Sequence, residues 1–359
     1  MPVMKILMAA RRYPPDVYSG TETVFRNLYE RARERHEVRL VVGWKQKRSM
    51  VPAEAVAVRL KGRKKVSAWM AMSKAIFTEV QRFKPDVVLS NSIEVPPTGA
   101  PSACIVHDLN FGHANSGLSS TLKAGFYSVR ARTLDAVITV SSASARALAA
   151  ANVDEGRIKV VHNGVDTDYF VPQAELDTAD DGIIRFAYPS RILPGKGQHH
   201  AIDAIARLPR RYKERVHLTI VGSVADQVYL DQLKVQAFNQ PVSFAHNVPE
   251  MAPYYQNADV ILYPTVMEEG FGFTAVEGLS CGKPVIWFDQ PAIREATGGH
   301  GVPVPREDVA AMRSAMIALI DDPARRAEMG RAGRRYAEGN LSWVRVWEQY
   351  ENILSSIAR

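Results

Sequence analysis

The sequence predicts an α/β protein of two domains, each with a parallel sheet covered by helices. Its 359 residues exceed what one ordinary hydrophobic core accommodates. Short runs rich in Val, Ile and Leu alternate with segments of helical periodicity, as strands and helices do around a parallel sheet. The alternation stops near residue 170 and starts again near residue 183, so we expect the same plan to occur twice.

The first half contains six expected strands and two expected helices. Apolar residues recur at helical spacing through residues 21–35. We interpret residues 66–83 as a core-facing helix, and the alternative is a helix that lies on a membrane. Its apolar residues on roughly one face are Val66, Trp69, Met70, Ile76, Phe77 and Val80. The strands are expected at 3–10, 37–42, 86–91, 102–107, 136–141 and 158–162.

The second half repeats the pattern after a break. Residues 169–182 contain Pro172 and an acidic, polar stretch, which is typical of a linker. Strands are expected at 183–189, 216–221, 242–245, 260–263, 284–288 and 302–304. Helices are expected at 198–208, 309–319, 323–338 and 342–357.

The net charge of +7 belongs to the first half of the chain. Residues 1–170 carry 25 Lys and Arg against 15 Asp and Glu, whereas residues 171–359 carry 20 against 23. Such an excess attracts acidic lipid surfaces, phosphorylated acceptors or nucleic acid, and a plain solvated loop is the alternative. The clustered basic residues are Lys45, Lys47, Arg48, Lys61, Arg63, Lys64 and Lys65.

The two cysteines, Cys104 and Cys281, lie far apart in apolar or tight contexts. This spacing fits a reducing cytoplasm and argues against a disulfide or metal framework. No run of about 18 apolar residues indicates a membrane span. The apolar start of the chain precedes Arg11 and Arg12, the reverse of a signal peptide, so it is expected to be a strand.

The first strand is followed by a loop, residues 13–22, that opens a helix. Gly20 has no Cβ, so an anion can approach the backbone at the positive end of that helix. Ser19 and Glu22 have the spacing of a capping box, which leaves a plain helix start as the alternative.

The second such loop, residues 189–197, carries two cations and two glycines. Arg191 and Lys196 could stabilise the negative charge that develops on a pyrophosphate leaving group without a metal. Two flexible surface cations are the alternative.

Residues 268–277 form the most specific segment, a glycine-rich turn between a strand and a helix. The carboxylates of Glu269 and Glu277 flank the turn and could accept hydrogen bonds from sugar and ribose hydroxyls. Backbone N–H groups from Phe271 to Phe273 could face the same ligand. A capping box from Thr274 to Glu277 is the alternative.

Two further positions follow strands. His107 precedes Asp108 at a strand end, where doubly wound sheets bind ligands, although a lone histidine is more often structural. Asp166 and Asp168 look like a metal-binding pair, but they lie in a turn that favours Asn, Gly and Asp for conformational reasons. We therefore expect no metal there.

Together these segments resemble the glycogen-synthase-like branch of the retaining GT-B glycosyltransferases, glycosyltransferase family 4. The resemblance covers nearly the whole chain and is most specific in the cation loop, in residues 254–259 and in residues 269–277. It implies a GT-B architecture, with two Rossmann-like domains facing across a cleft that holds the donor diphosphate. Ser19 and Ser190 stand where the family often has glycine. The implied parts are an acceptor-side domain at 1–170, a linker at 171–182, a donor domain at 183–340 and a C-terminal helix at 341–359 that crosses back to the first domain.

The resemblance also implies a role for each matching residue. Arg191 and Lys196 would bind the diphosphate, and Glu277 would hold the ribose hydroxyls. Gly20 would donate its N–H group to the donor phosphate, and His107 would line the sugar site. The donor sugar would be positioned by Glu269 and by the N–H groups of Phe271, Gly272 and Phe273.

The implied function is transfer of a sugar, with retention, from a nucleoside-diphosphate sugar to an acceptor hydroxyl in glycolipid, polysaccharide or glycoside biosynthesis. No metal or other cofactor is expected, and the acceptor should bind to the first domain through loops such as 45–50 and 110–118. The protein is expected in the cytoplasm, with an anionic membrane as a candidate peripheral partner and no nucleic acid. A nucleotide-sugar epimerase and a non-catalytic nucleotide-sugar-binding protein are the alternatives.

Overall fold

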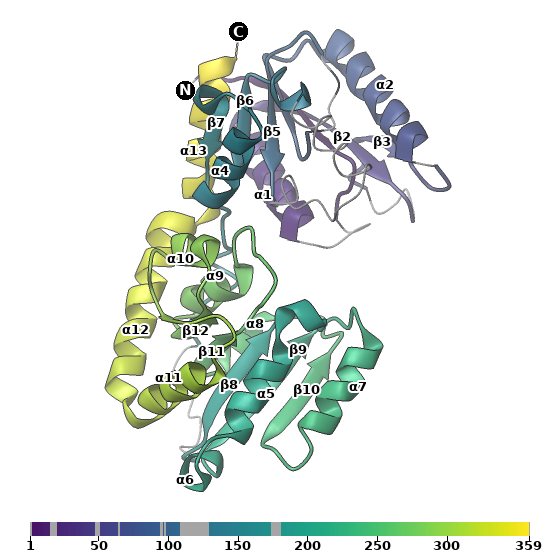
Figure 1. Ribbon diagram of the computed structural model, residues 1–359. Helices are drawn as coiled ribbons and strands as arrows, with labels where there is room; N and C mark the ends of the chain where they lie inside the picture. The colour runs from purple at the N-terminus through teal and green to yellow at the C-terminus, as the bar shows by residue number, and fades with distance from the viewer. Residues whose placement is uncertain are drawn as a thin grey trace. The chain divides into compact units, whose positions relative to one another are not determined.

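The protein divides into two compact units. The computed structural model describes residues 2–14, 20–46, 51–63, 65–93, 96, 98–107, 129–173 and 181–358. Unit 1 comprises Met1–Gly164 with Trp343–Arg359, and unit 2 comprises Val165–Ser342 (Figure 1). The division follows Gly164, whereas the sequence-based limits place the end of the first domain at residue 170. Ser19, Lys47, Arg48, Lys64, Asp108 and the expected acceptor loop at 110–118 lie outside the described residues.

Unit 1 contains a parallel sheet of seven strands in the order β3-β2-β1-β4-β5-β6-β7. The strands are short and largely buried, as expected for a sheet covered on both faces. Six of them were predicted, and the seventh, β3, pairs with β2 at the edge. The strands are β1 (Lys5–Ala10), β2 (Glu37–Trp44), β3 (Val56–Arg59), β4 (Val87–Ser90), β5 (Ser102–Val106), β6 (Ala136–Thr139) and β7 (Ile158–Val160).

Helices connect these strands and cover the sheet. They are α1 (Gly20–Arg35), α2 (Lys65–Phe83), α4 (Ser142–Ala150), the short η2 (Glu155–Arg157) and α13 (Trp343–Ile357). The predicted core-facing role of α2 is correct, and the predicted face is partly correct, because Ile76 and Val80 are buried in the core. Val66, Met70 and Phe77 are exposed, whereas the core contains Ala68, Met72, Ile76, Val80 and Phe83.

The last helix, α13, packs against α1 within unit 1. Its buried Glu351 accepts a hydrogen bond from Nε2 of His36 at 3.1 Å, and Nδ1 of His36 accepts one from the backbone N–H of Met4. Burial lowers the pKa of His36, so the imidazole is neutral here. This network joins the start of the chain, the end of α1 and the C-terminal helix.

Unit 2 contains a parallel sheet of six strands in the order β10-β9-β8-β11-β12-β13. Its strands are β8 (Ile184–Pro189), β9 (Val216–Gly222), β10 (Val242–His246), β11 (Val260–Tyr263), β12 (Val285–Phe288) and β13 (Val302–Val304). Its helices are η3 (Pro194–Lys196), α5 (Gln198–Ala206), α6 (Arg210–Lys213), α7 (Gln227–Gln236), α8 (Ala252–Gln256), α9 (Phe273–Ser280), α10 (Pro291–Ala296), α11 (Val309–Asp321), α12 (Pro323–Tyr336) and η4 (Ala337–Leu341). The predicted α/β class with two parallel sheets is confirmed.

In both sheets, the second and third strands of the unit lie on one side of its first strand, and the later strands lie on the other side. In unit 2 the resulting switch point lies between β8 and β11, and in unit 1 it lies between β1 and β4. Connections leave a switch point in opposite directions, so the carboxyl ends of its two strands border an opening in which α/β proteins bind ligands. The predicted cation loop follows β8, and the predicted glycine-rich turn follows β11. Within the described ranges, no helix has both the length and the apolarity to cross a membrane.

Candidate functional site

The cation loop and the end of β11 are fixed to each other by backbone contacts. The carbonyl of Gly195 accepts the N–H groups of Val266 and Met267 at 3.0 and 2.8 Å. Gly197 has φ 72°, and a Cβ there would lie 2.0 Å from the carbonyl oxygen of Pro264. Only glycine fits this close approach in the left-handed region. The chain therefore presents both loops as one rigid surface.

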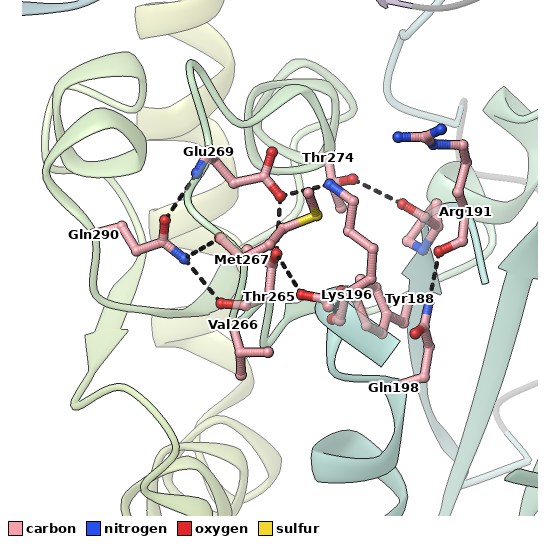
Figure 2. Close-up of polar contacts among 12 residues, drawn as sticks. Tyr188, Arg191, Lys196, Gln198, Thr265, Val266, Met267, Glu269, Thr274 and Gln290 are labelled. Carbon is pink, nitrogen blue, oxygen red and sulfur yellow. Dashed lines mark hydrogen bonds and ion pairs between the residues drawn. The ribbon is translucent and has the colours of Figure 1, made fainter. Parts of the chain in front are cut away.

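Lys196 and Glu269 meet across this surface. The Lys196 ammonium donates to Oε1 of Glu269 at 2.5 Å, and the hydroxyl of Thr265 donates to the same oxygen at 2.8 Å (Figure 2). The two charged side chains are only 11% and 13% exposed. An ammonium carries three protons, so contact with one carboxylate leaves donors for a phosphate oxygen. The pair fixes a cation at the switch point of unit 2.

Gln290, which sequence reasoning missed, binds the backbone of the loop that carries Glu269. Its side chain is buried, and its Nε2 donates to the carbonyls of Thr265 and Met267 at 2.9 and 3.1 Å. Its Oε1 accepts the backbone N–H of Glu269 at 3.1 Å (Figure 2). The signal in the sequence was a polar residue just after the predicted strand that became β12, at the ligand-binding edge of the sheet.

Arg191 belongs to the same loop but differs from Lys196. Its backbone carbonyl accepts the side-chain amide of Gln198 at 2.8 Å, which fixes the main chain. Its side chain is exposed, and among the described residues its guanidinium has no ion-pair partner. Figure 2 shows no dashed contact at this guanidinium. It is therefore an exposed cation beside a fixed one.

The glycine-rich turn leads into α9 without a side-chain cap. Gly272 is the N-cap residue with φ 99°, and α9 starts at Phe273. The capping box considered for Thr274 is not formed, because Thr274 lies inside the helix and its hydroxyl donates to the carbonyl of Pro189 at 2.8 Å. That bond joins α9 directly to Pro189, the last residue of β8 and the first of the cation loop. An uncapped first turn presents backbone N–H groups that suit an anion.

Glu277 lies one helical turn further along α9. The hydroxyl of Tyr255 donates to its Oε2 at 2.5 Å. Burial raises the pKa of Glu277 to about 7, and the bond from Tyr255 offsets part of that rise. The structure thus brings Lys196 and Glu269 into direct contact and places Arg191 on the same loop as Lys196. Glu277 lies on α9, and Phe271, Gly272 and Phe273 lie in the segment between the two glutamates.

Gly20 and His107 belong to unit 1. Gly20 is the first residue of α1, and His107 follows β5. Asn91, which follows β4, links the start of α1 to His107. Sequence reasoning missed this residue. Its Nδ2 donates to the carbonyl of Thr21 at 3.3 Å, and its Oδ1 lies 2.7 Å from Nε2 of His107.

This arrangement assigns the protons on His107. Because Asn91 donates from Nδ2 to Thr21, its Oδ1 faces the ring and Nε2 of His107 carries the hydrogen. Nδ1 is buried and has no hydrogen-bond partner among the described residues. Burial lowers the pKa of His107 to about 4, so the neutral ring offers an acceptor at Nδ1 near neutral pH.

The aspartates of the rejected metal motif form a turn. Oδ1 of Asp166 accepts the backbone N–H groups of Asp168 and Tyr169 at 3.2 and 3.0 Å. These bonds explain why Asp stands at position 166.

Comparison with known families identifies the class of this protein. Residues 18–169 match the family described as Glycosyltransferase Family 4, and residues 183–322 match Glycosyl transferases group 1. The two matches follow one another along the sequence, and each covers most of one unit. The chain belongs to glycosyltransferase family 4, which confirms the resemblance inferred from the sequence.

Two relatives illustrate the range of this family. The chain is 31% identical over 214 residues to a GDP-mannose-dependent monoacylated alpha-(1-6)-phosphatidylinositol monomannoside mannosyltransferase of Corynebacterium glutamicum, covering 55% of this chain and 56% of the relative. It is 30% identical over 223 residues to a D-inositol 3-phosphate glycosyltransferase of Pseudarthrobacter chlorophenolicus, covering 58% and 53%. The matches span about half the length of these relatives.

Solved structures share the fold over the whole chain. The crystal structure of Anabaena HepE in complex with UDP has a TM-score of 0.82 at 20% identity and covers 98% of this chain and 100% of its own. The lipopolysaccharide glycosyltransferase WaaG has a TM-score of 0.74 at 14% identity, with coverage of 98% and 99%. The expected GT-B architecture of two Rossmann-like domains is confirmed.

Proposed function

We propose that this protein transfers a hexose, with retention, from a nucleoside-diphosphate sugar to the hydroxyl of an acceptor. The observation that carries the proposal is the Lys196–Glu269 pair at the switch point of unit 2, with the Arg191 cation on the same loop. Fixed positive charge and uncapped helix N–H groups are what a departing diphosphate requires. Family membership supports the same reaction.

Each residue has a distinct part in this proposal. Lys196 and Arg191 stabilise the negative charge that develops on the leaving phosphate. The carboxylate of Glu277 accepts hydrogen bonds from the ribose hydroxyls. Glu269 and the N–H groups of the turn orient the sugar. The backbone N–H of Gly20 donates a hydrogen bond to the donor phosphate. Nδ1 of His107 accepts a hydrogen bond from a hydroxyl of the sugar.

Retention follows from attack on the same face as the leaving group. The acceptor hydroxyl forms the new bond as the phosphate departs, and its proton passes to that phosphate. Glu269 is poorly suited to act as a nucleophile, because Lys196 and Thr265 both donate to its Oε1. A double displacement through this carboxylate is therefore disfavoured.

The donor domain is proposed to be unit 2, and the acceptor is proposed to bind unit 1. A donor screen tests the reaction. Purified protein would be incubated with UDP- and GDP-hexoses, binding would be followed by thermal shift, and nucleotide release would be measured with and without lipid and polyol acceptors. Release that depends on an acceptor, with an anomeric configuration kept in the product, supports transfer. An epimerised donor supports the epimerase, and binding without turnover supports the non-catalytic alternative.

Peripheral contact with an anionic membrane is proposed for the outer face of α2. Val66, Met70 and Phe77 are 70%, 60% and 51% exposed and lie on one stripe of the helix together with the exposed Lys74. Lys61 and Arg63, also exposed, precede the helix. Apolar side chains beside basic ones are typical of helices that lie in the headgroup region.

Vesicle sedimentation tests this contact with an internal control. Replacing Met70 and Phe77 by Ser should reduce binding to vesicles rich in phosphatidylglycerol severalfold. Val228 and Val235 on α7 are 69% and 78% exposed in unit 2, so the same substitutions there form a matched control. Equal loss in both variants, or no preference for anionic vesicles, would reject the contact.

A further inference from the structure

The hydroxyl of Tyr255 holds one oxygen of the carboxylate that is proposed to bind the ribose. Tyr255 lies on α8 and is fully buried, and its hydroxyl donates to Oε2 of Glu277 on α9 at 2.5 Å. Among the residues that the structure describes, Oε1 of Glu277 has no hydrogen-bond partner. A carboxylate can accept about four hydrogen bonds, so Oε1 can bind the ribose hydroxyls while Oε2 stays bonded to the tyrosine.

This bond also affects the charge of Glu277. Burial raises the pKa of Glu277 to about 7, and the hydrogen bond from Tyr255 acts in the opposite direction, because it stabilises the ionised form. Two neighbouring groups, the phenol of Tyr255 and the thiol of Cys281, stay neutral between pH 5 and 9. Burial raises the pKa of Tyr255 well above its ordinary value and that of Cys281 to about 12. In this cluster of three residues, Glu277 is therefore the group whose charge changes near neutral pH.

The first residues of unit 2 hold Tyr255 in place. The ring of Phe170 packs edge-to-face on the ring of Tyr255, with the centroids 5.3 Å apart and an angle of 83° between the planes. The carbonyl of Phe170 accepts the hydroxyl of Ser280, in α9, at 2.7 Å. Tyr169 packs on Phe170, and its hydroxyl accepts the backbone N–H of Met251, the residue before α8, at 3.2 Å. This segment therefore joins α8 and α9, the two helices that carry the hydrogen-bonded pair.

We propose that Tyr255 is a positioning residue for the nucleotide and that Phe170 keeps it in place. The inference rests on the proposed transfer from a nucleotide sugar and adds residues that act through Glu277. Tyr255 orients the carboxylate so that Oε1 faces the ribose diol, and it favours the ionised form, which accepts hydrogen bonds from both hydroxyls. Phe170 acts one step further away, because its ring limits the displacement of the tyrosine ring.

Tyr255→Phe provides the first test, because it removes the hydroxyl and keeps the ring. Calorimetry would measure the Kd of the nucleoside diphosphate found in the donor screen at pH 6, 7, 8 and 9. Without the hydrogen bond, the protonation of Glu277 should move to higher pH by about one unit. The Kd should therefore rise about fivefold at pH 7, and the difference from the parent protein should narrow toward pH 9. Binding that weakens by the same factor at every pH would overturn the proposal.

A matched control and a double-mutant cycle separate this role from general damage. The hydroxyl of Tyr212, on α6, donates to Asp321 of α11 at 2.7 Å, so Tyr212→Phe removes the same kind of bond elsewhere in unit 2. Its Kd should stay within about twofold of the parent protein at every pH. In the Glu277→Gln background, Tyr255→Phe should change the Kd by less than about twofold, because the ionisable group through which it acts is gone. A full loss in that background would overturn the proposal.

Phe170→Leu tests the second step. It keeps an apolar side chain but removes the ring contact with Tyr255. The change of Kd with pH should shift in the same direction as in Tyr255→Phe, by a smaller amount. An unchanged pH dependence would overturn the part assigned to Phe170.

Urea unfolding at pH 5 and 9 tests the contact without a nucleotide. The free energy of unfolding of Tyr255→Phe should fall further below that of the parent protein at pH 9 than at pH 5, because at pH 9 the lost bond is one to an ionised carboxylate. Equal losses at the two pH values would overturn the proposal. If no nucleoside diphosphate binds, the proposed function fails, but the unfolding measurements still decide whether Tyr255 controls the charge of Glu277.

Discussion

The ammonium of Lys196 lies 2.5 Å from Oε1 of Glu269, although 73 positions separate the two residues in the sequence. Tyr188 donates its hydroxyl to the carbonyl of Lys196, so the backbone of the lysine is held as well as its side chain. A cation fixed before the substrate arrives stabilises developing charge without the reorganisation that a free lysine needs. The proposed reaction therefore depends on this residue more than on the exposed Arg191.

Lys196→Ala should lower kcat by about 10²–10³-fold, because it removes a fixed cation from the leaving group. Initial rates with the donor found in the screen would measure the change. Arg207→Ala is the control, since Arg207 is an exposed cation of the same unit that pairs with Asp203 at 2.7 Å. Its rate should stay within about twofold of the parent protein. A similar rate for Lys196→Ala would contradict the assigned role.

Glu277 should make nucleotide binding depend on pH. Its pKa of about 7 means that the carboxylate becomes protonated as the pH falls from 8 to 6, and a protonated carboxyl accepts fewer bonds from a ribose diol. We expect the Kd of the nucleoside diphosphate to rise over this range in the parent protein. In Glu277→Gln the Kd should be weaker at pH 8 and nearly constant. Calorimetric titrations at four pH values would measure the Kd for both proteins. The same change of Kd with pH in both proteins would contradict the role of Glu277.

The same shift predicts a stability effect of known sign. The folded pKa lies above the ordinary value of 4.5, so the folded state binds more protons between pH 4.5 and 7, and the free energy of unfolding falls as the pH rises through that window. Other groups such as His107, whose pKa is lowered, act in the opposite direction. The difference between the parent protein and Glu277→Gln isolates the glutamate, and urea unfolding at pH 5 and 8 would measure it.

Glu351→Ala should destabilise unit 1 by about 1–3 kcal/mol, because it leaves the buried Nε2–H of His36 without an acceptor. Urea unfolding followed by circular dichroism would measure the loss. Glu348 is the matched control on the same helix, since its pair with Arg345 is exposed. Glu348→Ala should cost less than about 0.5 kcal/mol. Equal losses would mean that the contact between His36 and Glu351 contributes nothing specific.

Local patterns predicted most of the fold and the loops of the site. Periodicity identified twelve of the strands, because buried parallel strands are short apolar runs. It missed β3, a strand of four residues at the sheet edge that are at most partly buried. For α2 it correctly placed Ile76 and Val80 in the core. It wrongly added Val66, Met70 and Phe77, because apolar residues occupy both faces of that helix and only the packing distinguishes them.

The contacts within the candidate site could not be predicted from local patterns. Arg191, Lys196, Glu269 and Glu277 were found because charged residues follow strand ends beside glycines. Their partners, however, come from distant segments, as Tyr255 does for Glu277. Gln290 and Asn91 also act through contacts that exist only when strands distant in sequence become neighbours. The rule that ligands bind at the carboxyl ends of strands would have marked both positions, but it could not have given their partners.

Gly197 provides the sharpest test of the rigid surface formed by the cation loop and β11. A Cβ at this position would lie 2.0 Å from the carbonyl oxygen of Pro264, and φ is 72°, so Gly197→Ala combines a backbone clash with a left-handed conformation. Gly299 has φ 79° with nothing within 4 Å of its added Cβ, so Gly299→Ala carries the conformational cost alone. We expect Gly299→Ala to lower the free energy of unfolding by about 1 kcal/mol and Gly197→Ala to lower it by more than about 2 kcal/mol. Gly197→Ala should also reduce kcat, because the clash displaces Lys196 from Glu269, and equal unfolding energies for the two variants would show that the loop is free to move.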